Sequence, residues 1–221
     1  IIKNNPNKEW DWREISRNIN ITVDIIKNNP NLPWDYGYMS ENPNITDEFV
    51  RENERKEWEW IILSRNPNIS WETILYSDTT NEYEPRLETT SYNPNVTWDV
   101  VRENKSRFMD HWDWDILSCH PNITWDIIKN NPNESWKLDY VSRNPNITWD
   151  IIKDNPDKKW HWGSISKNIN ITMDIIQNNP DLPWNYYFGL SENPNLTIDF
   201  IQDNLDKDWN WSKISHHHFT K

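Results

Sequence analysis

Residues 149–172 read WDIIKDNPDKKWHWGSISKNINIT, and this pattern recurs throughout the chain of 221 residues. The preceding unit, residues 125–148, reads WDIIKNNPNESWKLDYVSRNPNIT. Tandem units of 20–50 residues are typical of repeat proteins. We number the 24 positions of the unit from Trp149, which is position 1. Residues 1–22 lack the opening pair and so begin at position 3. In the longer units, positions after the insertion are counted back from the last residue, which is position 24. The nine repeats are residues 1–22, 23–46, 47–70, 71–97, 98–124, 125–148, 149–172, 173–197 and 198–221.

Each unit contains start and stop signals for two short helices. Thr172 precedes the run MDIIQNN, where a Thr cap and an acid near the helix start favour helix formation. Asn179-Pro180 ends this helix, because proline cannot continue it. The second helix follows a Trp and a polar cap position, His161, and Asn-Pro-Asn then predicts a turn.

Helices of about two turns are not stable alone in water, so neighbouring repeats must stabilise one another. The sequence therefore predicts an all-α fold, an α-solenoid of about nine ~24-residue helix–turn–helix repeats, with residues 1–221 forming one array domain. Position 18 is Ser in all nine repeats, and Asn recurs two positions later. Both residues indicate close packing or repeated side-chain hydrogen bonds. Residues 1–36 and 151–186 are identical at 25 of 36 positions, which indicates duplication of a block of repeats.

Composition limits the classes of function. The 17 Trp residues argue against disorder, whereas the net charge of -12 disfavours binding to nucleic acid. Cys119 is the single cysteine, so an intrachain disulfide is excluded. No apolar run reaches the ~20 residues of a membrane span, and no signal-peptide pattern opens the sequence. We therefore expect an intracellular protein that does not enter a membrane.

The unit opens with W-D-I-I-x-N-N-P and closes with N-P-N-I-T. This pattern resembles tandem repeats found in giant DNA virus proteomes, and the resemblance covers essentially the whole chain. It implies an interaction protein of uncharacterised biochemistry, located in the host cell or the virion. The resemblance assigns no catalytic or binding residue.

Tryptophan occupies two kinds of position. Trp stands at position 12 in eight of the nine repeats, with Pro85 in the fourth, and such recurrence favours a role in the core between repeats. Position 1 tolerates Val, Asp, Met and Ile, so a Trp there is expected to be partly exposed. A column of exposed Trp would suit a partner surface, and half-buried packing at a helix start is the structural alternative. The position-1 Trp residues are Trp71, Trp98, Trp125 and Trp149.

Other motifs favour structural roles over chemistry. Eight repeats end in Asn-x-Ser/Thr, but the last residue of each is already explained as a helix cap. His216, His217 and His218 lack an acid or Cys partner at a ligand spacing, which suggests a surface cluster or a tag-like remnant. Cys119-His120 shows no third partner for a nucleophile. We expect no catalytic residue, no metal site and no cofactor.

The leading hypothesis is a non-enzymatic scaffold that binds a protein partner. Residues 71–124 break the repeat pattern, and their aromatic and Arg residues are types enriched at interfaces. Tyr83, Arg86 and Phe108 are therefore partner-binding candidates, with neutral drift as the alternative. One rival is a reader of single-stranded nucleic acid, with one base bound per repeat. A second rival is an enzyme with a cleft in 71–124 that holds acids and His111 or His120.

If the central units carry specificity, replacing 71–124 with two units copied from 125–172 should give a folded chimera that has lost affinity for its partner. Circular dichroism checks the fold, and titration calorimetry with the isolated partner measures affinity. A folded chimera with native affinity would contradict the prediction.

Overall fold

The computed structural model describes residues 5, 8–77, 87–105, 112–217 and 219, and these contain helices and turns but no strand. The predicted all-α fold is confirmed for them. The first helices of the repeats are α2 (Val23–Lys27), α4 (Asp47–Glu52), α6 (Trp71–Ser77), α8 (Trp98–Asn104), α10 (Trp125–Asn130), α12 (Trp149–Asp154), α14 (Met173–Gln177) and α15 (Ile198–Asp203). The second helices are α1 (Trp12–Ser16), α3 (Tyr36–Met39), α5 (Trp60–Leu63), α7 (Leu87–Thr90), α9 (Trp114–Cys119), α11 (Leu138–Val141), α13 (Trp162–Lys167), the 3₁₀ turn η2 (Leu190–Glu192) and α16 (Trp211–Ile214).

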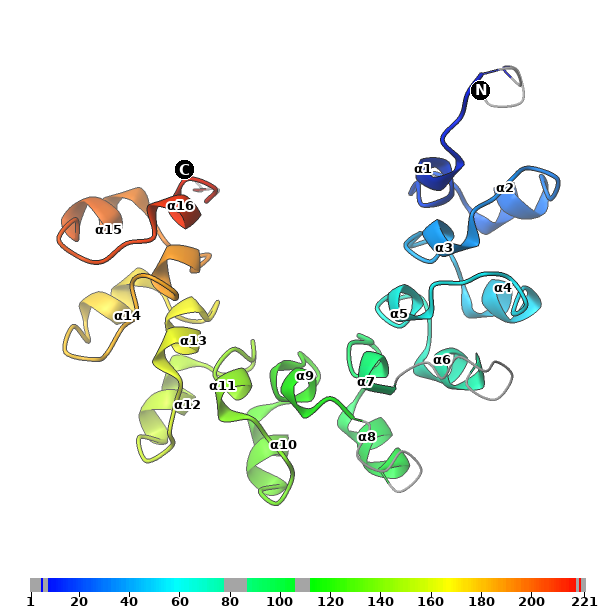
Figure 1. Cartoon of the computed structure of the whole chain (residues 1–221). Coiled ribbons are helices and arrows are strands. Elements are labelled where there is room, and N and C mark those ends of the chain that lie inside the picture. The colour runs from blue at the N-terminus through cyan, green and yellow to red at the C-terminus, as the bar shows by residue number, and fades with distance from the viewer. Residues whose placement is uncertain (1–4, 6–7, 78–86, 106–111, 218, 220–221) are drawn as a thin grey trace. The chain divides into compact units, whose positions relative to one another are not determined.

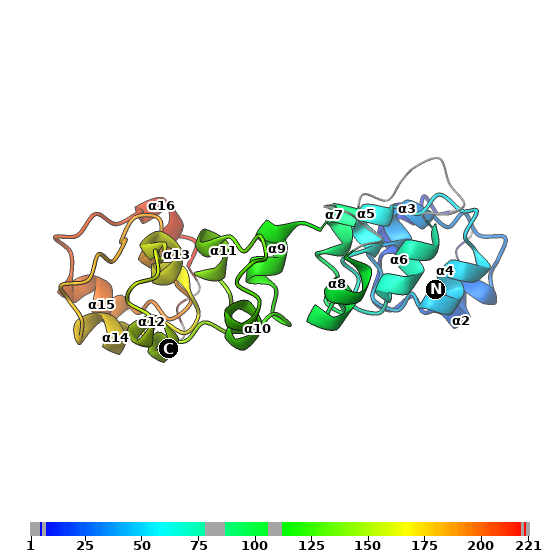
Figure 2. The same cartoon turned by 90° about the horizontal axis from the view of Figure 1, so that it is seen from below.

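The chain divides into two compact units, Ile1–Asp113 (unit 1) and Trp114–Lys221 (unit 2). The boundary falls inside repeat 98–124, between its two helices. Within each unit the first helices form one row and the second helices another, as Figures 1 and 2 show. Neighbours within a row touch, for example α1 with α3 and α9 with α11. The single array domain stays a prediction.

Threonine caps the first helices as the sequence predicts. In the repeat that begins at Met173, the Thr172 hydroxyl accepts a hydrogen bond from the backbone N–H of Ile175 at 3.4 Å. The hydroxyl satisfies one of the free amides that every helix start leaves. The same Thr cap precedes α2, α4, α8, α10, α12 and α15.

The Asn at position 7 connects the first helix to the Trp at position 12. The carboxamide of Asn155 donates to the Ile151 carbonyl at 2.7 Å and so satisfies a carbonyl at the helix end. Its own backbone carbonyl accepts the indole N–H of Trp160 at 2.9 Å. Because this bond satisfies the polar atom of a buried Trp, the ring can enter the core. The arrangement recurs at Asn29/Trp34, Asn53/Trp58, Asn131/Trp136, Asn179/Trp184 and Asn204/Trp209.

Three positions that are apolar in most of the described repeats form the core, together with the position-12 Trp. Position 4 lies on the first helix, position 17 on the second, and position 23 in the turn before the next repeat. In repeat 149–172 these residues are Ile152, Ile165 and Ile171, which are 3%, 0% and 0% exposed. Each such side chain contributes about 1.5–3 kcal/mol when fully buried. A core of single residues from each repeat needs neighbouring repeats to cover it.

The invariant Ser at position 18 joins consecutive repeats. Its hydroxyl accepts a hydrogen bond from the backbone N–H of position 13 in the following repeat, at 2.9–3.1 Å. At Ser142 the same hydroxyl also donates to the Leu138 carbonyl, one turn back in its own helix. A larger side chain would separate the two repeats, which explains why Ser does not vary. The pairs are Ser16/Asp35, Ser40/Glu59, Ser91/Asp113, Ser118/Lys137, Ser142/His161, Ser166/Asn185 and Ser191/Asn210.

The Asn at position 20 reaches back into the preceding repeat. The Asn144 carboxamide nitrogen donates to the carbonyls of Ser118, His120 and Ile123 at 2.9–3.2 Å, and Asn144 is fully buried. Its oxygen accepts the N–H of Asn146 at 2.8 Å. Equivalent bonds are made by Asn42, Asn66, Asn93, Asn168 and Asn193, which we call with Asn144 the Asn column.

The Asn of each Asn-x-Ser/Thr motif, at position 22, also donates to the preceding repeat. The Asn146 amide nitrogen reaches the carbonyls of Pro121 at 2.7 Å and Ile123 at 3.2 Å. A glycan on that nitrogen would remove one of its two N–H donors. The motif thus has the structural role that the sequence favoured.

Asn144→Ala should destabilise the protein by roughly 3–5 kcal/mol, because it leaves several buried backbone groups without partners at about 1–3 kcal/mol each. Asn144→Asp should be worse, since it removes the donor and places a carboxylate against carbonyl oxygens. Asn144→His should lose least, because His occupies this position as His120 and His217. Urea unfolding measures the order, and an Asp variant as stable as wild type would contradict the account.

Candidate functional site

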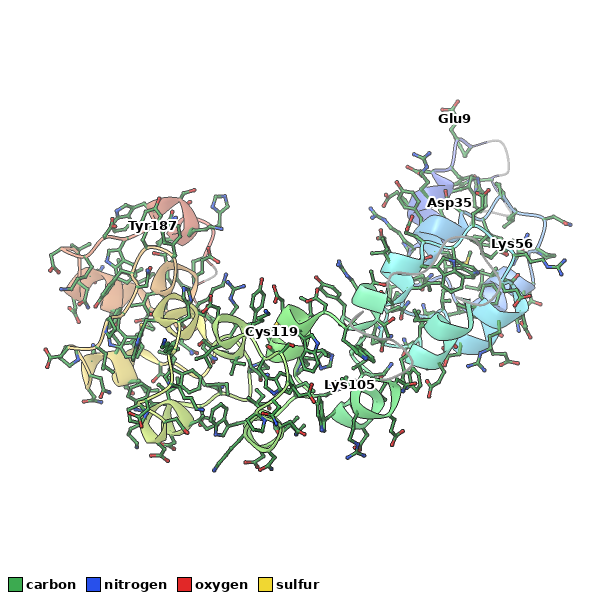
Figure 3. All side chains as sticks on the ribbon, turned by 60° about the horizontal axis from the view of Figure 1, so that its bottom comes forward. Glu9, Asp35, Lys56, Lys105, Cys119 and Tyr187 are labelled. Carbon is green, nitrogen blue, oxygen red and sulfur yellow. The ribbon has the colours of Figure 1, made fainter. Side chains whose placement is uncertain are left out.

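A groove crosses repeats 1 to 3 of unit 1, beside the N-terminal ends of α1, α3 and α5. It has a volume of about 1050 Å³ and is lined by residues 10–13, 33–37 and 55–59. Asp35 and Lys56 of this groove are labelled in Figure 3. Each of the three segments includes positions 12 and 13 of its repeat, and the first two also include position 14. Trp60, at position 14 of the third repeat, does not line the groove. The lining therefore repeats from one unit to the next. We call this surface the aromatic groove.

Aromatic rings of successive repeats pack edge to face along the aromatic groove. Trp12 contacts Trp34 with ring centroids 5.4 Å apart, and Tyr36 contacts Trp58 at 5.1 Å. In each pair, position 14 of one repeat meets the position-12 Trp of the next. Edge-to-face pairs stabilise beyond the area they bury. The groove floor is therefore fixed before any ligand arrives.

Charged groups of both signs line the same groove. The side chains of Asp11 and Asp35 cap α1 and α3. Among the described residues, the side chain of Glu59 makes no such bond to α5. The Lys56 ammonium lies 5.2 Å from the centre of the Tyr36 ring, an attractive cation–π geometry. Burial raises the pKa of the Tyr36 hydroxyl, which therefore stays protonated at neutral pH. The groove can thus offer rings, carboxylates and cations to one ligand.

The four position-1 Trp residues are half-buried. Trp125 packs on Trp160 at 5.6 Å and Trp149 on Trp184 at 5.9 Å, so each contacts the position-12 Trp of the next repeat. This packing matches the structural alternative for these two residues. That Trp71, Trp98, Trp125 and Trp149 bind a partner stays a prediction. Tyr83, Arg86 and Phe108 lie outside the described residues.

The residues considered for chemistry make structural bonds. His120 takes the place of Asn in the Asn column, and its Nδ1 accepts the N–H of Asn122 at 3.2 Å. His217 occupies the same position in repeat 9 and donates from Nε2 to the Asn193 carbonyl at 2.9 Å. His217 is thus part of the column and not of a surface cluster. The Cys119 thiol contacts the Ile116 carbonyl at 3.4 Å. Among the described residues, no group of three or more His, Cys, Asp or Glu side chains could hold a metal.

A second feature, in repeat 173–197, was missed by the sequence analysis. Tyr187 is 39% exposed and Phe188 is 70% exposed, and their rings meet at 4.7 Å. They border a pocket of about 460 Å³ that also contains Asp208. The one-residue insertion in this repeat was the available signal. Tyr187 is labelled in Figure 3.

Glycine permits this local distortion. A Cβ on Gly189 would lie 2.4 Å from the Ser166 side chain and 2.6 Å from the Asn185 carbonyl. No other residue can pack so closely against the preceding repeat. The inserted residue turns the second helix into the 3₁₀ turn η2 and leaves Tyr187 and Phe188 outside it.

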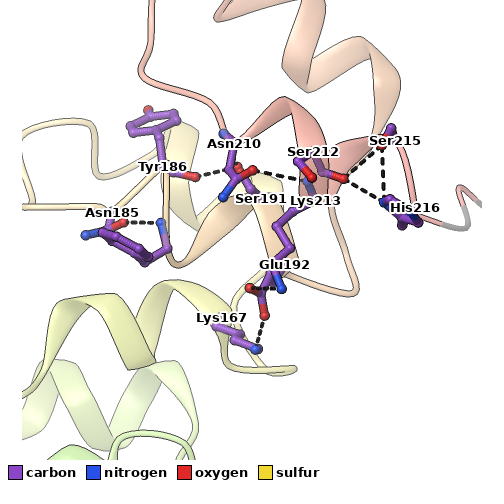
Figure 4. A network of polar contacts seen from close by, with 11 residues as sticks. Lys167, Asn185, Tyr186, Ser191, Glu192, Asn210, Ser212, Lys213, Ser215 and His216 are labelled. Atoms are coloured by element: carbon purple, nitrogen blue, oxygen red, sulfur yellow. Dashed lines mark hydrogen bonds and ion pairs between the residues drawn. The ribbon is translucent and has the colours of Figure 1, made fainter.

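Charged groups join the last three repeats near this pocket (Figure 4). Glu192 of η2 forms ion pairs with Lys167 of α13 and, at 3.1 Å, with Lys213 of α16. The hydrogen bond from Lys167, with a further one from Lys213, lowers the pKa of the Glu192 carboxyl. The two lysines are largely exposed, so the pairs contribute little stability and mainly fix the orientation of Glu192.

Comparison with known proteins identifies no relative: no family model, no curated protein and no solved structure matches this chain. Within the described part of the chain, no helix has both the length and the apolar character that crossing a membrane requires.

The Glu192 carboxyl should titrate below the ordinary Glu value of about 4.3. Since its folded pKa is depressed, its stabilising contribution is present above the unfolded pKa and is lost as pH falls through the folded one. Carbon-detected NMR of the side-chain carboxyl measures the midpoint. Lys167→Met should raise it, and Lys213→Met should raise it less. A midpoint that neither variant moves would show that the ion pairs do not form in solution.

Proposed function

We propose that this chain is an α-solenoid acting as a non-enzymatic scaffold, which binds an extended segment of a protein partner in the aromatic groove. The main support is the aromatic groove, because this one groove, with a volume of about 1050 Å³, crosses three successive repeats. An extended peptide presents its side chains at regular intervals. A groove whose rings and charges recur once per repeat suits such a ligand.

The links between repeats support the α-solenoid. Position 18 bonds to position 13 of the next repeat, and position 20 bonds back to the preceding one, in both units. In solenoids each repeat contacts only its neighbours, and binding surfaces extend over several repeats.

The lining of the groove favours a protein ligand over nucleic acid. The lining contains four carboxylates and three cations, namely Asp11, Asp35, Glu57 and Glu59 with Arg13, Arg55 and Lys56. The chain as a whole carries a charge of -12, which repels a phosphate backbone. Trp and Tyr beside charged groups of both signs are typical of protein interfaces. His120, one of the two histidines that the enzyme hypothesis offers, is buried and bonded within its turn, and His111 lies outside the described residues.

Selection of peptides from a random phage library on the immobilised full chain tests the proposal. We expect selected peptides to be aromatic and charged, and their affinity to fall at least tenfold in the double variant Glu57→Lys/Glu59→Lys. Both side chains are exposed, so the fold should be retained. Fluorescence anisotropy measures the affinity.

The matched control is Asp154→Lys/Asp157→Lys, the same change of charge on exposed residues of unit 2. Its affinity should stay within twofold of wild type. Equal losses in both double variants would mean that net charge, and not the groove, governs binding. Failure to select any peptide would also count against the proposal.

A further inference from the structure

Repeats 2 and 8 differ at one point that changes the surface. Residues 32–40 read LPWDYGYMS, whereas 182–191 read LPWNYYFGLS with one extra residue. In repeat 2 the ring of Tyr38 is half-buried. In repeat 8 the extra residue leaves Tyr187 and Phe188 exposed. The two repeats are otherwise close copies, so the neighbours of Tyr38 in repeat 2 indicate what kind of group can cover an exposed ring in repeat 8.

In repeat 2, arginine side chains cover the ring of Tyr38. The guanidinium groups of Arg13 and Arg17, from the preceding repeat, lie 5.6 and 5.8 Å from the centre of the Tyr38 ring. Two further surface tyrosines have the same kind of neighbour. Arg65 lies 4.4 Å from the ring of Tyr92, and Arg143 lies 5.1 Å from the ring of Tyr140. Arg favours such contacts because its planar, weakly hydrated cation stacks on aromatic faces.

The repeat that precedes repeat 8 lacks the corresponding arginines. The counterpart of Arg13 is Gly163, which has no side chain, and the counterpart of Arg17 is Lys167. Arg17 and Lys167 both pair with the glutamate of the next repeat, Glu41 and Glu192, but only Arg17 also lies over a ring. Within the described part of the chain, no Lys or Arg lies over the rings of Tyr187 or Phe188.

The pocket beside these rings favours a cation. It is lined by Trp184, Asn185, Tyr186, Tyr187, Phe188 and Asp208, so it combines aromatic rings with one carboxylate. Asp208 makes no salt bridge with a described residue. Residues 173–217 contain seven Asp and Glu against two Lys, a local charge of 2 − 7 = −5. Such a surface attracts a positively charged ligand and strengthens its binding to an open ring.

We propose that this pocket binds an arginine side chain from a basic segment of a partner protein. The guanidinium would lie against the rings of Tyr187 and Phe188 and pair with Asp208, as Arg13 and Arg17 lie against Tyr38 within the chain. This inference rests on the proposed function, because it assumes that the chain binds a segment of a protein partner. It concerns a different unit and a different surface from the aromatic groove.

The test is an NMR titration of the full chain with a Gly-Ser peptide that carries one arginine. We expect saturable shifts confined to residues 184–188 and 208. Replacing the arginine by citrulline, its neutral isostere, should weaken binding at least tenfold. Equal binding of the citrulline peptide, or no saturable shift at these residues, would overturn the proposal.

Variants of the pocket give a second readout. Phe188→Ser and Asp208→Asn should each weaken binding of the arginine peptide at least fivefold, whereas the exposed controls Leu205→Ser and Asp203→Asn should stay within twofold. Phe188 is 70% exposed, so its variant should fold, and circular dichroism checks this. Native affinity in both pocket variants would overturn the proposal.

The groove variant Glu57→Lys/Glu59→Lys separates this inference from the proposed function. It should leave binding of the arginine peptide unchanged. If library peptides bind at the aromatic groove but the arginine peptide does not bind the pocket, only this inference fails. If the arginine peptide binds and the groove selects nothing, the inference survives and the groove proposal fails.

Discussion

The structure depends on the buried Asn side chain at position 20, whose carboxamide donates hydrogen bonds to backbone carbonyl groups of the preceding repeat. The turn between repeats exposes carbonyl groups to a region from which water is excluded, and each would be costly if left unpaired. One Asn side chain pairs up to three of them, as Asn144 does with Ser118, His120 and Ile123. The Ser at position 18 satisfies an amide in the opposite direction along the chain. Together the two side chains make each turn dependent on both of its neighbours.

This dependence explains how helices of four to seven residues persist. Such helices are too short to be stable alone, and each repeat contributes only a few large side chains to the core. Packing between neighbours supplies the rest, through the position-12 Trp and the aliphatic side chains at positions 4 and 23. Because the hydrogen bonds fix the distance between repeats, side chains on the second helices are held at regular intervals. Those intervals make a recurrent surface such as the aromatic groove possible.

Much of the local structure could be predicted because it follows from short-range rules. Thr172 as a cap and His161 at the second cap follow from spacing within one repeat. The structural role of Ser142 follows from the recurrence of Ser at position 18 in every repeat. The pocket of repeat 8 could not be found in this way. It depends on Gly189 fitting against Ser166 of the preceding repeat, a contact that no pattern within one repeat reveals. His217 was misread for the same reason, since its partner Asn193 belongs to another repeat.

Hydrogen exchange at position 13 tests the central claim most directly. The backbone amides of Lys137, His161, Asn185 and Asn210 precede their helices, and each donates to a Ser hydroxyl of the preceding repeat. If these bonds hold the repeats together, the four amides should exchange as slowly as core helix amides, through unfolding of neighbouring repeats. Exchange near the rate of an unstructured peptide would contradict the account, because the bonds from position 13 to the Ser hydroxyls would then not hold neighbouring repeats together.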